Sequence, residues 1–418
     1  MKSTVIGFSL IILCWGCSAS EKKEVSSSTQ KEGVPKRTQK ADTAKASPTS
    51  DLNSSYEMNF IRGVTYGATD EVMVGEIANV AVDDQNRVFI ADMDQTTIHA
   101  FSPGGDFLTS IGKQGRGPGE FGIMTPRTTM EIHSGRLYVT DGYYTVKVHV
   151  YSLEDFSFSH SMKLEAVNTD EFQALKNYDP KYIHPLTDGR FLVSYQHSDP
   201  EYRESKSFIR YVTQDSSRRI VSGPILEQKG RTYLTYENPN TNRVAKRLSF
   251  PFFGESLIAV SDDDHLYATK SEEFKVQVYN TDGELVNTIR HPFKNRVFNK
   301  TKVLERYKKT DFMVMLDDYE GQDVALKMIR QAENLPETWP ALENMFFDDE
   351  NRLWAATIVD DIGVYEWWVL KKSGEVITKF EWPRDKPIKV VQNGYMYTHE
   401  TEKETCIENI VRYRIKME

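Results

Sequence analysis

NVAVDDQNRVFIAD (79–92), followed by TIHAFSPGGDFLTSIG (97–112), decides the fold class of this 418-residue chain. Each stretch has the pattern of two strands joined by a tight polar turn. Large side chains alternate with the strand period of two, as Val88 and Ile90 do against Phe89. Asp, Asn and Gly occupy the turns because they cap their own backbone or tolerate left-handed conformations. We therefore predict two β-hairpins that together form one four-stranded antiparallel unit.

The first hairpin recurs along the chain. Its further copies are at 131–141, 184–196, 258–270, 345–357 and 390–400. The second hairpin recurs at 147–164, 207–226, 275–293 and 366–383. The last unit has only one more strand, at 409–417, and segment 58–67 reads as a lone strand able to complete it. Such closure removes an open sheet edge. The sequence therefore predicts an all-β fold, a six-bladed β-propeller of four-stranded antiparallel blades.

The motifs of the first unit resemble those of NHL-type six-bladed propellers. The resemblance rests on VAxDxxNxxFIAD and IxxFxPxGxFL within 79–112, and on KQGRGPGEFGIMTP (113–126), a Gly-rich loop before a new strand. It covers nearly all of the chain after the leader and is strongest in the first and fourth units. With the leader described next, the chain looks like uncharacterised lipoproteins of Bacteroidota-type bacteria. This resemblance implies a fold but not a function, because propellers carry many unrelated activities.

The first 17 residues have the order of a secretory signal: Lys2, then the apolar run 5–13, then small residues. LCWGC (13–17) resembles the lipobox of bacterial lipoproteins, which implies a diacylated Cys17. Leu13 is one place further from the cysteine than in that pattern, so an ordinary cleaved signal is the alternative. Residues 18–55 have few large apolar side chains and are expected to form a disordered tether. We predict a lipid-anchored protein of the bacterial cell envelope, most simply at the outer membrane, with its folded domain (56–418) outside the cytoplasm.

The composition narrows the class of partner. The formal net charge is −9, whereas a nucleic-acid-binding domain is expected to be basic. Cys14 and Cys17 belong to the leader, which leaves Cys406 as the last of the three cysteines. We expect Cys406 to be a small buried apolar residue. The expected protein is a monomer that contacts the membrane only through its lipid.

Long connections are predicted on one face of the ring. With strands A to D running outward in each blade, the A–B and C–D turns share one face, and these turns are tight. The long segments 165–182, 227–249 and 294–338 all join strand D to the next strand A, on the other face. Long one-sided insertions usually build the binding surface of a repeat protein. Loop insertions are also inexpensive to accommodate, which is the alternative explanation.

The insertion 294–338 is predicted to be partly helical. Segments 303–319 and 321–336 have apolar residues at helix spacing, and Pro336 follows the second. We expect these helices to lie across the face as a partial lid. Their methionines, Met313, Met315 and Met328, are expected to pack against the propeller.

The candidate binding residues are those that the pattern assigns to the long-loop face. Tyr143 and Tyr144 are adjacent aromatics suited to stacking on a sugar or peptide, and Asp360 and Asp361 suit a cation or a hydroxylated ligand. The full set is Arg116, Glu120, Tyr143, Tyr144, His197, Asp360, Asp361 and His399. A solvated loop is the alternative interpretation for each aspartate, and burial between blades for one tyrosine.

Motifs for catalysis are absent from the sequence. It contains no HExxH, no CxxC pair and no GxSxG elbow, so we assign no catalytic residue, no metal ligand and no cofactor. His99 and His149 occupy equivalent strand-C positions and are expected to be packing or solvent positions. The acidic runs 83–84, 262–264 and 348–349 are expected to form turns. GRGPGE (115–120) lacks the Lys-Ser/Thr of a phosphate loop and is interpreted as a step between blades.

Two hypotheses of function follow. The first is a binding module that presents the long-loop face to a protein, peptide or glycan. The second is a metal-dependent propeller enzyme of the lactonase, lyase or hydrolase kind, with a divalent metal in the axial channel. The second requires carboxylates or imidazoles that converge in the channel.

Overall fold

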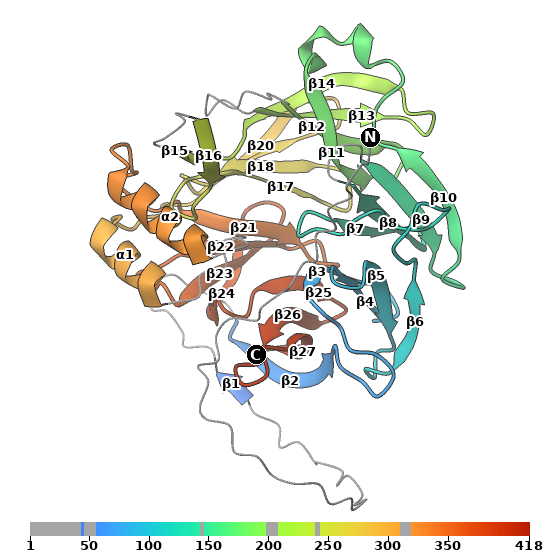
Figure 1. Ribbon diagram of the computed structural model, residues 1–418, viewed down its shortest axis with the longest axis horizontal. Helices are drawn as coiled ribbons and strands as arrows, with labels where there is room; N and C mark the ends of the chain where they lie inside the picture. Colours follow the sequence, from blue (N-terminus) through green and yellow to red (C-terminus); the bar gives the residue numbers. More distant parts are fainter. Residues whose placement is uncertain (1–42, 46–55, 143–145, 198–207, 239–242, 310–318) are drawn as a thin grey trace, which may run out of the picture.

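The structure is a computed structural model that describes residues 43–45, 56–142, 146–197, 208–238, 243–309 and 319–418. Five antiparallel sheets of four strands, and a sixth that has a short fifth strand, follow one another around a ring in sequence order (Figure 1). The predicted all-β six-bladed propeller is therefore confirmed. We number the blades 1 to 6, beginning with the strands that follow the N-terminal strand.

The first three blades contain twelve strands. Blade 1 consists of β3 (Ile77–Val82), β4 (Val88–Asp92), β5 (Thr97–Phe101) and β6 (Phe107–Ile111). Blade 2 consists of β7 (Met130–His133), β8 (Arg136–Asp141), β9 (Lys147–Ser152) and β10 (Phe158–Lys163). Blade 3 consists of β11 (Tyr178–Pro185), β12 (Phe191–His197), β13 (Phe208–Gln214) and β14 (Ile220–Lys229). Between blades 2 and 3 lie two short 3-10 turns, η1 (Thr169–Glu171) and η2 (Gln173–Leu175).

The second half of the ring repeats the pattern. Blade 4 consists of β17 (Ser256–Val260), β18 (Leu266–Lys270), β19 (Lys275–Tyr279) and β20 (Leu285–Arg290). Blade 5 consists of β21 (Leu342–Phe347), β22 (Leu353–Ile358), β23 (Val364–Leu370) and β24 (Val376–Pro383). Blade 6 consists of β25 (Ile388–Gln392), β26 (Tyr395–Thr401), β27 (Glu408–Met417) and β2 (Met58–Tyr66), with β1 (Thr43–Lys45) beside β2.

Strand β2 closes the ring, as predicted for segment 58–67. It pairs antiparallel with β27, with Phe60 opposite Ile415 and Tyr66 opposite Ile410. Phe60 is fully buried, and its ring centroid lies 4.8 Å from that of Phe380 in blade 5. The closing strand is thus held by its own blade and by the blade before it. Strand β1 lies within the segment expected to be a tether, and the rest of 18–55 is outside the described residues.

The hydrophobic cores lie between neighbouring blades. One buried cluster joins Phe89 and Ile98 of blade 1 to Leu137 and Tyr151 of blade 2, and comparable clusters join blades 4 and 5 and blades 5 and 6. Strands B and C are buried on both faces for this reason, which explains their nearly continuous apolar sequence. A blade therefore loses its core if a neighbour is removed, and the ring is stable only when it is closed.

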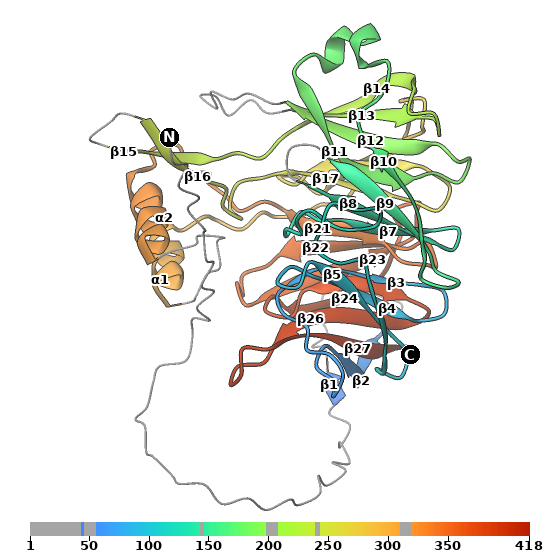
Figure 2. The same ribbon diagram turned by 45° about the vertical axis from the view of Figure 1, so that its right-hand side comes forward.

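Two insertions form a structure that we call the cap: the hairpin of β15 (Leu234–Asn238) and β16 (Arg243–Leu248), and helices α1 (Lys300–Lys309) and α2 (Tyr319–Gln331). Figure 2 shows all four elements standing together on one side of the ring. The predicted helices are confirmed. The hairpin was not predicted, since 227–249 was interpreted as a plain connection. Within the described residues, neither cap helix nor any other is long and apolar enough to cross a membrane.

The cap has a core of its own. Phe252 and Ile329 are fully buried there, and the rings of Phe250 and Phe252 stack with centroids 5.1 Å apart. Met328 is buried in the same cluster, as expected, whereas Met313 and Met315 lie outside the described residues. Ile358 of β22 also belongs to this cluster. The cap is therefore packed onto the ring at blade 5.

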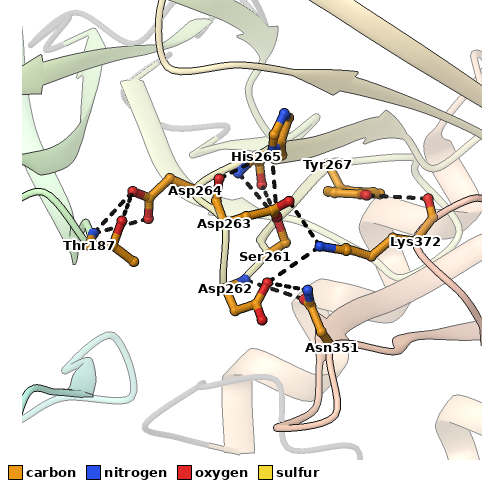
Figure 3. A network of polar contacts seen from close by, with 9 residues as sticks. All are labelled: Thr187, Ser261, Asp262, Asp263, Asp264, His265, Tyr267, Asn351 and Lys372. Atoms are coloured by element: carbon orange, nitrogen blue, oxygen red, sulfur yellow. Dashed lines mark hydrogen bonds and ion pairs between the residues drawn. The ribbon is translucent and has the colours of Figure 1, made fainter.

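The face opposite the cap consists of the short A–B and C–D turns within the blades, and side chains of these turns link neighbouring blades. Thr187 of blade 3 donates from its hydroxyl to Asp264 of blade 4 at 2.6 Å. Asn351 of blade 5 donates to Asp262, and Lys372 of blade 5 forms an ion pair with Asp263 at 2.9 Å. Figure 3 shows this network, which spans three consecutive blades. The acidic run 262–264 thus has a structural role in fastening the ring.

Candidate functional site

Strand A of each blade lies innermost in the ring. Neighbouring A strands contact one another, as β3 does with β7 and β25, and β17 does with β21. In propellers, such strands surround a central channel. The A strands carry a set of polar side chains among their apolar ones: Glu131, Tyr182, His184, Glu343 and Lys389.

These side chains are reached by solvent although many protein atoms surround them. Tyr182 is 41% exposed, and Lys389 is exposed, yet the surrounding atoms lower the pKa of Lys389. His184 Nδ1 lies 3.5 Å from Glu131 Oε2. Desolvation opposes the charge of His184, but Glu131 outweighs it and raises the pKa of the imidazole. Side chains that line a narrow water-filled channel are expected to be both exposed to solvent and partly desolvated by the surrounding protein.

Five charged or aromatic residues gather beside strand A of blade 5, where the backbone of Ser271 bonds to Glu255 at 2.9 Å and to Leu342, the neighbour of Glu343, at 3.0 Å. We call them the mouth cluster: Arg231, Glu255, Glu343, Tyr365 and Arg384. The chain crosses between ring and cap at four places: before β15, after β16, before α1 and after α2. Arg231 lies in the first crossing, Glu255 at the end of the second, and Glu343 just after the fourth. The insertions therefore position these side chains as well as the cap.

Within the mouth cluster, Arg231 and Glu255 form an ion pair. Nε of Arg231 lies 2.6 Å from Oε2 of Glu255, and 57% of the arginine side chain stays exposed. Desolvation acts against the charge of Arg231, but Glu255 outweighs it and raises the pKa of the guanidinium. An arginine has five N–H donors, and Nε supplies only one of them to this pair.

Arg384 reaches the cluster from the end of blade 5. Its Nε donates to the carbonyl oxygen of Val364 at 3.1 Å, and its guanidinium carbon lies 4.0 Å from the ring centroid of Tyr365. Stacking of this kind is typical of arginine, whose charge is delocalised and weakly hydrated. Tyr365 also packs against the cap core. The orientation of Arg384 is thus coupled to the position of the cap.

Glu343 is the titratable centre of the cluster. Burial raises the pKa of its carboxyl to about 7, and the charge of Glu255 adds to the effect. Arg384, a hydrogen bond with Tyr365 and Arg231 act in the opposite direction but do not outweigh burial. Near neutral pH, Glu343 therefore exists in both its protonated and ionised forms. Perturbed carboxyls in a concave site are frequent markers of function.

The sequence profile of a family described as a six-bladed β-propeller, DUF5128, matches residues 30–241, which is half of the chain. The chain belongs to the DUF5128 family. No curated protein sequence matches this DUF5128 member significantly.

Three solved structures are similar to this DUF5128 member at low sequence identity. A "putative exported protein" from Bacteroides fragilis NCTC 9343 is 13% identical, with a TM-score of 0.47, and the match covers 88% of this chain and 98% of that one. A member of the DUF4221 family from Bacteroides vulgatus is 10% identical, with a TM-score of 0.47 and coverage of 86% and 98%. Virginiamycin B lyase from Staphylococcus aureus is 11% identical, with a TM-score of 0.39 and coverage of 86% and 99%.

Arg116 and Glu120, two predicted binding residues, lie in the loop between blades 1 and 2 of the DUF5128 chain. Arg116 is exposed. The carboxylate of Glu120 accepts a hydrogen bond from the backbone N–H of Gly117 at 2.8 Å, which, with Lys113, lowers its pKa. Phe121 of this loop is fully buried between the two blades. The interpretation of GRGPGE as a step between blades is confirmed, and Glu120 organises that step.

Asp360 and Asp361, which were predicted to bind together, have different roles in the structure. Asp360 Oδ2 lies 3.1 Å from Nη1 of Arg296, which belongs to the crossing before α1. Asp361 accepts a hydrogen bond from the backbone N–H of Gly363 at 2.7 Å, as a turn-forming aspartate does. Asp360 therefore ties the base of the cap to blade 5, while Asp361 shapes its own loop.

The two predicted histidines lie on different blades. His197 packs its ring edge against Tyr178, with centroids 5.2 Å apart. His399 Nε2 lies 3.1 Å from Glu408 Oε2, and that carboxylate oxygen also accepts the backbone N–H of Ile77 from blade 1. His399 thus belongs to the junction between blades 6 and 1. The predicted Tyr143, Tyr144 and Cys17 lie outside the described residues.

Strand-C histidines of blades 1 and 2 form equivalent buried chains of polar contacts. His149 Nδ1 lies 2.8 Å from Ser161 Oγ, and its Nε2 lies 3.3 Å from Asp141. His99 has the same arrangement with Ser110 at 3.0 Å and Asp92 at 3.4 Å. The expectation that both are packing positions is confirmed. An open hollow of about 510 Å³ borders Ser161. Because the same His–Ser–Asp contacts occur in blade 1, we interpret these contacts as part of the blade architecture and not as part of a site at the hollow.

The turn interpretation of the acidic pairs is also confirmed. Asp83 accepts the backbone N–H of Gln85 and Arg87 and the side chain of Arg87, and Asp348 makes the equivalent bonds with Arg352. Cys406 is half-buried rather than buried, because it lies in the turn between β26 and β27 with φ of 58°. In the part of the chain that the structure describes, no three His, Cys, Asp or Glu side chains are placed to hold a metal ion.

The mouth cluster was not predicted from the sequence. Glu343 lies two residues before the segment taken as strand A of blade 5, and Arg231 and Glu255 lie at the ends of the connection 227–249 and beyond it. A usable signal exists in retrospect, because a single charged residue interrupts each of several otherwise apolar A strands. A register error of one residue reverses the direction of a strand side chain, so this signal requires the structure.

Proposed function

We propose that this DUF5128 protein is an exported, lipid-anchored binding module whose ligand occupies the mouth cluster beneath the cap. The observation that carries the proposal is that the crossings between cap and ring bring Arg231 and Glu255 beside strand A of blade 5, which carries Glu343. Binding sites are concave, with a few polar groups fixed in orientation among apolar and aromatic ones. The mouth cluster and the cap core next to it have that composition.

The residues of the mouth cluster favour a peptide or glycan as the ligand. Tyr365 offers aromatic surface, as does Tyr182 of the nearby strand β11, which acts on Arg231. The guanidinium and carboxyl groups of the cluster offer directed hydrogen bonds to amides and hydroxyls. The site is polar at several points, so a purely apolar ligand would leave charged groups desolvated at a cost in binding free energy. A ligand with many hydrogen-bonding groups avoids that cost.

The anchor is proposed from the leader sequence. Lipidation of Cys17 holds the ring at a membrane surface through residues 18–55, and a single acyl chain contributes about 0.8 kcal/mol per buried CH₂. Metabolic labelling with a radioactive fatty acid tests the anchor. The wild-type chain is expected to incorporate label, and Cys17→Ala is expected to lose it. Equal labelling of the two chains would contradict the proposed anchor.

A thermal-shift screen of the purified full chain tests the binding role. Neutral oligosaccharides, acidic oligosaccharides, peptides and divalent metals are each added with and without EDTA. A ligand at 100 times its Kd stabilises the folded state by about 2.7 kcal/mol. We expect a glycan or a peptide to raise the melting temperature. Arg231→Ala should abolish this rise, and Arg219→Ala should preserve it. Arg219 is the control because its ion pair with Glu171 is exposed and lies on another blade.

Two results of the screen would oppose the proposal. A shift that survives Arg231→Ala would place the ligand elsewhere on the molecule. A shift produced only by a divalent metal and reversed by EDTA would favour the metal-dependent enzyme over the binding module.

A further inference from the structure

The mouth cluster differs in charge from the protein as a whole. The chain carries a formal net charge of −9, yet two guanidinium groups, those of Arg231 and Arg384, act on Glu343 in this cluster. Glu255 forms an ion pair with Arg231, at 2.6 Å. When Glu343 is protonated, the five residues carry two positive charges and one negative charge. The cluster is then a local positive site on an acidic protein.

Protonated Glu343 adds a hydrogen-bond donor to that site. A neutral carboxyl donates one O–H, whereas an ionised carboxylate only accepts. Burial and the nearby charge of Glu255 hold the pKa of Glu343 at about 7, against the opposing influence of Arg384, Tyr365 and Arg231. The donor form is therefore available at neutral pH at little cost in free energy. After burial, Glu255, Arg384, Tyr365 and Arg231 are the largest influences on the pKa of Glu343.

We propose that the mouth cluster binds a carboxylate group of its ligand, held by the guanidinium groups of Arg231 and Arg384 with Glu343 as a hydrogen-bond donor beside it. The inference rests on the proposed function and gives its ligand a chemical class. Guanidinium groups match carboxylates in geometry and charge, and such charge-assisted bonds are about twice as strong as neutral ones. Arg231 is suited to this role because 57% of its side chain is exposed and its Nε supplies only one of five N–H donors to Glu255.

The pH dependence of ligand binding has a definite sign. A ligand carboxylate favours the protonated form of Glu343, so binding takes up a proton and weakens as the pH rises above 7. A ligand amine would favour ionised Glu343, so its binding would release a proton and strengthen over the same range. The direction of the pH dependence therefore distinguishes an acidic ligand from a basic one.

Two sources supply the same carboxylate chemistry. One is an acidic oligosaccharide, in which the carboxylate is part of a uronic acid unit. The other is a short peptide with a free C-terminal carboxylate. Each probe has a matched neutral form: the oligosaccharide with its carboxyls reduced to alcohols, and the peptide with a C-terminal amide. Preference for one acidic probe over the other identifies the source.

The test is isothermal titration of the full chain with oligogalacturonate and with C-terminal peptides, each beside its neutral form, at pH 6, 7 and 8.5. For wild-type protein we expect binding of an acidic probe to weaken by up to about thirtyfold between pH 6 and pH 8.5, as the linkage of one proton at pH 7 requires. Glu343→Gln keeps an amide donor in place. It should bind at pH 8.5 nearly as tightly as at pH 6.

The controls separate this inference from the binding role itself. Glu154→Gln, in an exposed turn of blade 2, should follow the wild-type pH profile. Arg384→Ala should weaken binding of the acidic probe at least tenfold and binding of its neutral form little.

An affinity that rises through pH 7, or a pH profile unchanged in Glu343→Gln, would overturn the inference. Binding of a neutral probe alone, abolished by Arg231→Ala, would also overturn it while leaving the binding role intact. If no probe binds in a way that depends on Arg231, the carboxylate inference and the proposed binding role both fail.

Discussion

Lys372 Nζ lies 2.9 Å from a carboxylate oxygen of Asp263, so that the C–D turn of blade 5 is tied to the A–B turn of blade 4 (Figure 3). Partial burial alone would raise the pKa of Asp263, but the hydroxyl of Ser261 and the ammonium of Lys372 lower it to about 2. The pair belongs to the network that fastens blades 3, 4 and 5 on the turn face. Its two side chains are 37% and 47% exposed.

Lys372→Met should destabilise the fold modestly and in a pH-dependent way. An exposed pair contributes about 0.2–1 kcal/mol, because solvent screens the charges. Asp263 has a pKa below that of an unfolded aspartate, about 3.9. The contribution of the pair is therefore present above pH 4 and is lost as the pH falls towards 2. Urea unfolding at pH 6 should separate wild type from Lys372→Met, and at pH 2.5 the difference should shrink. Equal differences at both pH values would contradict the assignment.

Asp141→Ala should be far more damaging than a change at an exposed aspartate. Asp141 is buried and accepts hydrogen bonds from the backbone N–H groups of Gly122 and Ile123, while His149 lies 3.3 Å away. Removing the acceptor leaves these part-buried N–H groups and the buried His149 without their partner, at a cost of about 2–4 kcal/mol. Asp155→Ala is the matched control, since Asp155 only orders an exposed turn around Ser157. Chemical denaturation that ranks the two variants equally would refute this role.

Gly119→Ala should destabilise the step between blades 1 and 2. Gly119 has φ of +69°, and a Cβ there would lie 2.8 Å from the ring of Phe158. The strain of a left-handed alanine is about 1–2 kcal/mol, and the clash adds about 1–3 kcal/mol. Gly135 has the same φ but open space around it, so Gly135→Ala should show the conformational strain alone. Melting temperatures measured side by side test this ordering.

Glu343→Gln should stabilise the unliganded protein at high pH. Glu343 has a folded-state pKa of about 7, raised by burial and Glu255, against about 4.3 when unfolded. The wild type therefore keeps its full stability below pH 4 and loses it progressively as the pH rises to 7, by about 3 kcal/mol. The glutamine variant lacks this loss. The gain in unfolding free energy of Glu343→Gln over wild type should grow from pH 5 to pH 8. A gain that is independent of pH would contradict the raised pKa.

The fold was predictable because each blade repeats its own local signals. Polar turns such as 83–86 and the alternation around Phe89 specify hairpins without any tertiary information. The lone strand 58–67 and the truncated last unit then determine how the ring closes. Local pattern also predicted the helices of 294–338, although not the hairpin of β15 and β16. The strands of that hairpin pack against the cap helices, so their apolar residues follow no blade register.

The mouth cluster could not be predicted from the sequence because its residues are distant in the chain and come together only in the folded ring. Arg231 and Arg384 are more than 150 positions apart, and each lies in a connection whose direction no local pattern specifies. The predicted residues were chosen for their loops, and several of them, such as Glu120 and Asp361, proved to shape the loop itself. A polar side chain in a loop more often satisfies nearby backbone than a ligand.

Hydrogen exchange of the full chain, with and without the probe that gives the largest thermal shift, tests the binding site most directly. The account predicts that ligand slows exchange in peptides containing Arg231, Glu343 and Tyr365. Exchange on the turn face, around Asp83 and Asp263, should be unchanged. Protection of the turn face, with exchange at the mouth cluster unaltered, would contradict a site beneath the cap.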